Sequence, residues 1–102
     1  MFTETSLAQP SVLLTVVCEI TLKDNMLKLY KNLKVRGYTI SSLAAAEDCY
    51  GTTMGGDVEN SVIEIKALVS KEISDVVMHT LRLHRGDNPV IVYRHDVETM
   101  LG

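Results

Sequence analysis

The sequence is poor in the residue types on which several classes of protein depend. It has no Trp, one Phe and four Tyr among 102 residues, so few side chains are available to stack on bases or sugars. Its two cysteines, Cys18 and Cys49, are too few and too far apart for a disulfide framework, and no Cys/His spacing is typical of zinc. We therefore expect reduced thiols in a cytoplasmic protein, and no metal site.

Basic residues are also in deficit, because 10 Lys and Arg face 13 Asp and Glu and give a formal net charge of −3. Such a balance leaves no global positive field for nucleic acid or an anionic membrane, so any anion has to be held locally. Residues 1–10 lack the basic and apolar regions of a signal peptide. The longest apolar stretch, 12–20, is far too short to span a membrane. We expect a polar leader over residues 1–11, one domain over residues 12–102, and no membrane insertion.

The hydrophobic pattern predicts two similar halves. In chain order the expected elements are a strand over 12–20, a helix over 23–36 ended by Gly37, a strand over 38–46, a strand over 61–69, a helix over 70–85 with Ser70 as N-cap, and a strand over 90–94. This βαββαβ order defines a ferredoxin-like α+β sandwich, a four-stranded antiparallel sheet with both helices on one face.

The other face of that sheet has no helix to cover it. The first strand is apolar on both sides, and Val62 and Leu68 add to the uncovered face. We therefore expect that face to be buried against other copies of the chain. An exposed sheet that receives a different partner is the alternative.

The segment between the two halves, residues 47–60, has three glycines, four acids and no base. A loop of this length without regular structure is uncommon in a compact domain, and it is usually functional or disordered.

Short motifs at the expected places resemble the PII signalling proteins. Arg36-Gly-Tyr-Thr-Ile40 is similar to their Gly-x-Thr-Val junction, and more closely to the Lys-Gly-Tyr-Thr-Val form of the PII-like branch associated with bicarbonate transport. Gly86-Asp87 resembles the Gly-Asp of their B-loop, and Val97-Glu98 resembles the Val-Glu that follows. The segment 47–60 stands where these proteins carry their T-loop.

The resemblance implies a homotrimeric regulator, in the manner of nitrogen regulation, with clefts between subunits that bind a small molecule such as an adenine nucleotide. The bound effector sets the T-loop, which controls a partner transporter or enzyme. The implied cleft residues are Arg36, Gly37, Tyr38 and Thr39 on one wall and Gly86, Asp87 and Asn88 on the other, with Arg94 close by. The implied partner-contact residues are Glu47, Asp48, Tyr50, Gly51, Met54 and Asp57.

Some positions depart from the PII pattern. Pro89 stands where the B-loop lysine contacts phosphate, and Ala44-Ala-Ala-Glu47 replaces a glycine-rich stretch at the base of the T-loop. A triphosphate normally needs several basic groups or a metal, so a less charged nucleotide, another small ligand, or no ligand are the open alternatives. Arg36 can also act as a helix C-terminal charge, and Tyr38 can simply pack on its strand.

Two other classes of function remain open. A CutA-type trimeric divalent-ion protein shares the fold, but it expects metal ligands and a short connection in place of segment 47–60. An enzyme of the ferredoxin-like class needs an acid, a base or a nucleophile in a recognisable arrangement, and none is present. His79 and His84 are five residues apart, which does not place two imidazoles on one helical face. We expect no enzymatic activity.

Overall fold

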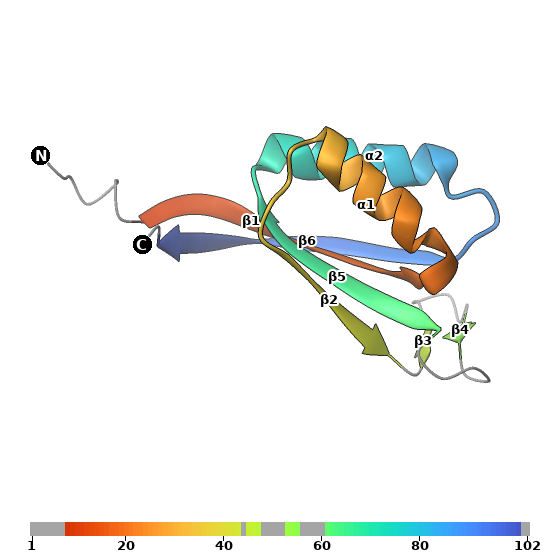
Figure 1. Ribbon diagram of the computed structural model, residues 1–102. Helices are drawn as coiled ribbons and strands as arrows, with labels where there is room; N and C mark the ends of the chain where they lie inside the picture. Colours follow the sequence, from red (N-terminus) through yellow and green to blue (C-terminus); the bar gives the residue numbers. More distant parts are fainter. Residues whose placement is uncertain (1–7, 44, 48–52, 56–60, 101–102) are drawn as a thin grey trace, which may run out of the picture.

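The computed structural model of the protein describes residues 8–43, 45–47, 53–55 and 61–100. Figure 1 shows two helices lying above a twisted sheet. In chain order the elements are β1 (Ala8–Glu19), the short 3₁₀ helix η2 (Ile20–Leu22), α1 (Lys23–Asn32), β2 (Tyr38–Leu43), β3 (Ala45–Glu47), β4 (Thr53–Gly55), β5 (Val62–Val69), α2 (Lys71–His84) and β6 (Val90–Met100).

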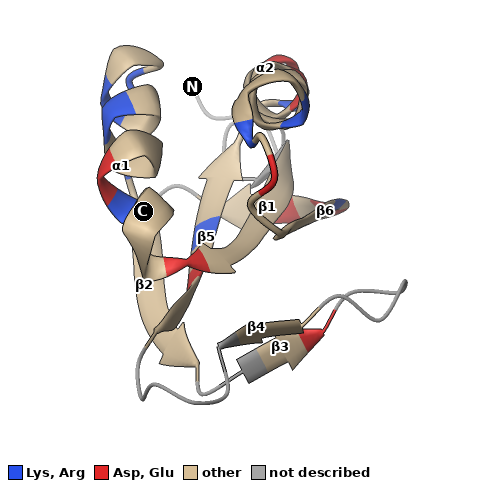
Figure 2. Ribbon diagram, turned by 90° about the vertical axis from the view of Figure 1, so that its right-hand side faces the viewer, with Lys and Arg blue, Asp and Glu red and all other residues tan. Residues whose placement is uncertain are grey.

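The main sheet has the strand order β2-β5-β1-β6, and every neighbouring pair is antiparallel. The central strand β1 therefore pairs on both sides with strands from the second half of the chain. Both helices cover the same face of this sheet (Figure 2). The predicted ferredoxin-like α+β sandwich is confirmed.

The core lies between the sheet and the helices. Each strand turns alternate side chains toward the helices, and the predicted alternation of β5 is confirmed, since Ile63, Ile65, Ala67 and Val69 are buried there. They pack with Leu14, Val16 and Cys18 of β1, Met26 and Tyr30 of α1, and Val77 and Leu81 of α2. The predicted N-cap of α2 is also confirmed, because Ser70 Oγ accepts a hydrogen bond from the backbone N–H of Ile73 at 3.2 Å.

Helix α1 ends four residues earlier than the sequence pattern predicts. The backbone N–H of Val35 donates to the Tyr30 carbonyl at 2.9 Å, and the N–H of Lys34 donates to Lys31 at 3.1 Å. This pair of bonds is a Schellman motif, whose terminating residue takes a left-handed conformation. Lys34 occupies that position with φ of 59°. The prediction that Gly37 ends the helix was wrong, because glycine is favoured but not required at such a site; Gly37 has φ of 68° where the chain turns into β2.

β1 and β6 are both longer than expected. Residues 8–11, expected to belong to a polar leader, pair with β6 as far as the partners Ala8 and Met100. β5 ends opposite Val12, so beyond this point β1 and β6 continue as a two-stranded ribbon (Figure 1). The predicted strand ended at Arg94 because mixed polar residues follow it, whereas the ladder with β1 extends the strand to Met100.

Part of the segment expected to be a loop is folded. The strand predicted to run to Ala46 ends at Leu43, and Ala45–Glu47 instead pairs with Thr53–Gly55 in a separate two-stranded sheet. Met54 is only 1% exposed and packs with Val17 and Val62 on the sheet face away from the helices. Met54, one of the residues that the resemblance implies as partner contacts, is therefore packed within its own chain. Among the other residues expected there, Glu47 is exposed, whereas Asp48, Tyr50, Gly51 and Asp57 lie outside the described residues.

Candidate functional site

The predicted cleft residues lie on opposite edges of the sheet. Arg36 to Thr39 lead into β2, which forms one edge, and Gly86 to Asn88 lead into β6, which forms the other. Tyr38 and Arg94 share a row that runs Tyr38–Ala67–Leu14–Arg94. Three strand spacings separate them by about 14 Å. One small ligand therefore cannot touch Tyr38 and Arg94 of the same chain, because the core residues Ala67 and Leu14 lie between them.

On the β2 edge, Tyr38 lies against the core. Its ring meets that of Tyr30 edge to face, with centroids 5.9 Å apart and planes at 70°. Tyr38 is 38% exposed, so part of its ring remains open to a ligand or a neighbouring subunit. Arg36, Gly37 and Thr39 are exposed. This edge presents one cation and one aromatic ring.

Two weakly acidic side chains of the core, Tyr30 and Cys18, stay protonated at neutral pH. Burial, with a smaller contribution from nearby Cys18, raises the pKa of Tyr30 to about 12. Burial, together with the charge of Glu19, raises the pKa of the Cys18 thiol to about 11. A protonated, buried thiol is a poor nucleophile, so Cys18 acts as a core residue, as its place on an apolar strand indicates.

On the β6 edge, the residues before the strand form a fixed turn. The side-chain amide of Asn88 donates to the Arg85 carbonyl at 2.9 Å, and the backbone N–H of Asn88 donates to the same oxygen at 3.1 Å. Arg85 Nη1 donates in return to the Asn88 carbonyl at 3.3 Å. Gly86 takes φ of 61° within this turn. Asn88 therefore holds the turn in place, while Gly86 and Asp87 are exposed at its tip.

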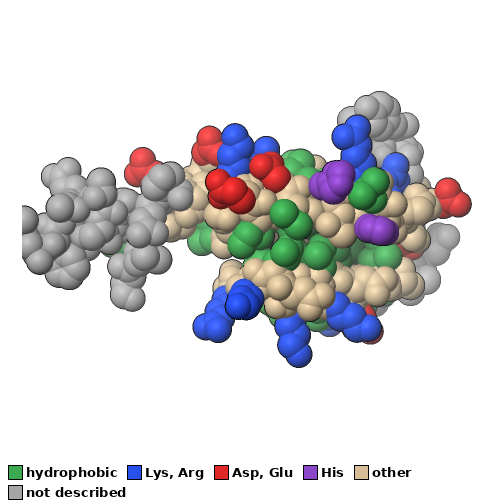
Figure 3. Space-filling view, turned by 90° about the horizontal axis from the view of Figure 1, so that it is seen from above, with side chains coloured by type: hydrophobic (Ala, Val, Ile, Leu, Met, Phe, Trp, Pro, Cys, Tyr) green, Lys and Arg blue, Asp and Glu red, His purple; other side chains and the backbone are tan. Residues whose placement is uncertain are grey.

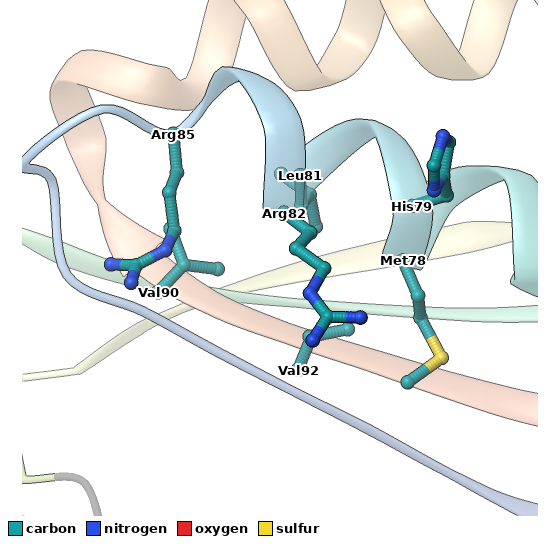
Figure 4. Close-up of a pocket in the computed structure, with 7 residues that line it drawn as sticks. All are labelled: Met78, His79, Leu81, Arg82, Arg85, Val90 and Val92. Atoms are coloured by element: carbon teal, nitrogen blue, oxygen red, sulfur yellow. The ribbon is translucent and has the colours of Figure 1, made fainter.

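Beside this turn lies a groove of about 420 Å³ between α2 and β6. Met78, Leu81, Val90 and Val92 form apolar walls, and Figure 4 shows the side chains of Arg82 and Arg85 extending from the helix over these valines. His79 is the third basic side chain of the lining, and no acidic side chain is among the described residues that line it. The groove suits a ligand with an apolar body and an anionic group, since guanidinium binds phosphate or carboxylate in a bidentate manner.

The sequence-based prediction missed this pair of arginines. Arg82 and Arg85 are three residues apart and thus share a helical face. Both stand at the C-terminal end of a helix, where interaction with the helix dipole is sufficient explanation for a basic residue. The available signal was the presence of two arginines close to Pro89, the position where the resemblance implies a lysine.

Arg94, which the resemblance placed near the cleft, is bonded to side chains of its own chain. Its Nη1 donates to Ser74 Oγ at 2.7 Å and forms an ion pair with Asp75. Both partners belong to α2, and the Arg94 side chain is half-buried. Its charge is therefore already satisfied by a carboxylate.

The sheet face away from the helices is mixed in character. The hairpin of β3 and β4 covers one end, and Leu68 and Tyr93 remain about half exposed at 48% and 45%. Across the middle, Thr39, Lys66, Thr15 and Tyr93 form one row. Lys66 pairs with Glu64 at 3.6 Å. The Thr15 hydroxyl is buried within the chain and has no hydrogen-bond partner among the described residues.

No three His, Cys, Asp or Glu side chains within residues 8–43, 45–47, 53–55 and 61–100 are grouped so that they could hold a metal ion. Within the same ranges, no helix is both long and apolar enough to cross a membrane.

No protein-family model matches the sequence, and no curated protein matches it. Solved structures do resemble it. One is a nitrogen regulatory PII-like protein, CPII, from Thiomonas intermedia, solved with ADP, AMP and bicarbonate bound; it is 21% identical, with 94% of this chain and 93% of that chain covered and a TM-score of 0.79. A putative PII-like signalling protein from Thermus thermophilus is 25% identical, with 91% and 92% covered and a TM-score of 0.70.

A DUF3240 family protein from Shewanella baltica is more distant, at 12% identity, 82% and 86% coverage and a TM-score of 0.62. The fold of this chain is thus that of PII-like proteins, and the resemblance inferred from the short motifs is confirmed at the level of the fold.

Proposed function

We propose that the protein is a cytoplasmic PII-like signal-transduction regulator. It binds an adenine nucleotide between the subunits of a homotrimer and controls a partner transporter or enzyme through segment 47–60. It is not an enzyme in this proposal. The observation that carries the proposal is the groove beside the Gly86–Asn88 turn, which joins apolar walls to two guanidinium groups on a PII-like fold.

An oligomer would complete the site. When the β2 edge of one copy lies beside the β6 edge of the next, Arg36 and Tyr38 of the first copy approach the groove of the second. The apolar walls then contact the base, while Arg82 and Arg85 bind phosphate oxygens. Their positive charge takes the place of the B-loop lysine that Pro89 has replaced.

The number of cations favours a nucleotide with few phosphates. Arg82, Arg85 and Arg36 supply three positive charges in the completed site, with no carboxylate among the described groove residues. AMP and ADP match this charge better than ATP, because a triphosphate usually requires additional basic side chains or a metal ion. The similar solved structure of CPII, which has ADP, AMP and bicarbonate bound, supports AMP or ADP as the ligand.

The response reaches the partner segment through β2. This strand carries Tyr38 at its start and ends at Leu43, and a single residue separates it from the β3–β4 hairpin. A ligand that orders the β2 edge therefore acts on the element that leads into segment 47–60. We expect that segment to change its order when the nucleotide binds, which is a known form of switching.

Calorimetry and thermal unfolding with AMP, ADP and ATP test the proposal. We expect AMP or ADP to raise the melting temperature, since a ligand at 100 times its Kd adds about 2.7 kcal/mol. The double variant R82Q/R85Q should lose this response, whereas the matched variant K28Q, on the other helix, should keep it. Absence of any nucleotide response, or a monomer in light scattering at micromolar concentration, would contradict the proposal.

A further inference from the structure

The charges of the protein are separated between its two layers. The helix layer, residues 23–36 and 71–85, carries eight of the ten Lys and Arg but three of the 13 Asp and Glu, a formal charge of +5. The rest of the chain has two bases and ten acids, a formal charge of −8. Figure 2 shows most of the basic positions on the two helices. The net charge of −3 therefore conceals a basic face.

The cations of this layer are available to a partner. Seven of the eight are exposed: Lys28, Lys31, Lys34, Arg36, Lys71, Arg82 and Arg85. None of the eight forms an ion pair with a described carboxylate, since Asp75 is engaged by Arg94 of β6 and the other ion pair involves Lys66 of β5. Their charge is therefore not neutralised within the described part of the chain.

Exposed apolar side chains are also present in the helix layer. Leu83 and Val76 on α2 are 61% and 44% exposed. Between the helices runs a narrow groove of about 180 Å³, with apolar walls that include Leu22, Leu29 and Leu81. Viewed from above the helices, hydrophobic side chains line the seam, basic side chains project along the lower margin, and acidic and basic side chains lie together along the upper margin (Figure 3). A basic face with apolar side chains at its surface is typical of proteins that lie on anionic membranes.

We propose that the helix layer binds the surface of an anionic phospholipid membrane. The three arginines belong to the proposed nucleotide site, whereas the five lysines are spread over both helices, which suits many mobile headgroups better than one acidic peptide. Five of the eight are lysines, compact point charges that attract anionic lipid at about 1 kcal/mol each near the surface. Leu83 and Val76 add apolar contact at the level of the headgroups.

This role is compatible with the proposed oligomer but does not depend on it. The helix layer covers one face of the sheet, whereas Thr15, Leu68 and Tyr93 lie on the other, so packing of the open sheet faces leaves α1 and the exposed face of α2 free. Lys28, Lys31 and Lys71 do not line the groove proposed for the nucleotide. Membrane binding and nucleotide binding can therefore be altered separately.

Vesicle flotation with the full chain tests the inference. The protein should float with vesicles of mixed phosphatidylcholine and phosphatidylserine at low salt, and remain unbound with phosphatidylcholine alone or at high salt. The variant K28Q/K31Q should weaken binding about tenfold or more, because two surface charges are removed. The variant L83S should also weaken it, while K66Q, on the opposite sheet face, should leave it unchanged.

Three results would overturn the inference. The first is equal flotation with charged and neutral vesicles, and the second is equal flotation of K28Q/K31Q and the unchanged chain. The third is binding of soluble polyglutamate or duplex DNA without binding of phosphatidylserine vesicles, which would assign the face to an acidic protein or a nucleic acid. Circular dichroism of each variant shows that the fold is retained, and its response to AMP or ADP shows that nucleotide binding is a separate property.

Discussion

Arg94 of β6 is linked to α2 through Ser74, whose Oγ accepts a hydrogen bond from Arg94 Nη1 at 2.7 Å. Ser74 is fully buried and in turn donates to the Lys71 carbonyl at 2.7 Å. One hydroxyl therefore joins the first turn of α2 to the edge strand. The polar serine is accommodated in a buried position because both its donor and its acceptor roles are used.

We predict that S74A lowers the free energy of unfolding by about 1–3 kcal/mol, because it leaves a charged donor and a carbonyl without this partner. Urea unfolding monitored by circular dichroism measures the change. The matched variant D75A removes only the exposed side of the ion pair and should cost less than about 1 kcal/mol. Equal losses for the two variants would show that the buried hydroxyl is not the important link.

A second prediction concerns the packing of the β3–β4 hairpin on the sheet. M54A should lower the free energy of unfolding by about 2–5 kcal/mol, as expected for truncation of a buried methionine. M100A is the control, since Met100 is 79% exposed and its truncation should change stability by no more than about 0.5 kcal/mol. A small loss for M54A would indicate that the hairpin leaves the sheet at little cost.

The left-handed residue at the end of α1 leads to a prediction of increased stability. K34G should raise the free energy of unfolding by up to about 1 kcal/mol, because glycine removes the steric cost of the positive φ, partly offset by its greater unfolded-state entropy. K31G, in the last turn of the same helix, should instead lower it by about 1 kcal/mol. Thermal unfolding of the two variants gives opposite shifts if Lys34 is strained.

Stability should fall in alkaline solution. Cys18 and Tyr30 have folded-state pKa values of about 11 and about 12, above their ordinary values of 9.0 and 10.0. Because the unfolded chain then releases these protons first, the contribution of each group is present below its ordinary pKa and is lost as the pH rises through the folded value. Urea unfolding between pH 8 and pH 12 should show the decline, and Y30F should reduce its upper part. An unchanged profile in Y30F would contradict this assignment.

The sequence predicted the elements that depend on a periodic pattern of apolar residues or on a local cap. The alternating apolar residues of β5 and the capping serine of α2 gave both elements to within one residue, since burial and capping are local properties. Prediction from the sequence failed where a segment distant in the chain determines the local structure. Residues 8–11 are polar in isolation but pair with β6, and Met54 looks like a loop residue until the hairpin places it on Val17 and Val62.

The candidate site was predictable only in part. The motifs located the turn at Gly86–Asn88 and the entry to β2, but they gave no indication that Arg94 is engaged by Asp75. The motifs did not include Arg82 and Arg85, and a basic residue at a helix C-terminus is sufficiently explained by the helix dipole. Only the adjacency of α2 and β6 turns these two arginines into a pair beside an apolar groove.

The central place of β1 has a consequence for synthesis of the chain. Both hydrogen-bonding partners of this strand, β5 and β6, lie in the second half of the sequence. At about 5–20 residues per second, the ribosome supplies them only seconds after β1 has emerged. During that interval a strand that is apolar on both faces has no partner from its own chain. We expect β1 to be the segment of the nascent chain most prone to pair with other chains during that interval.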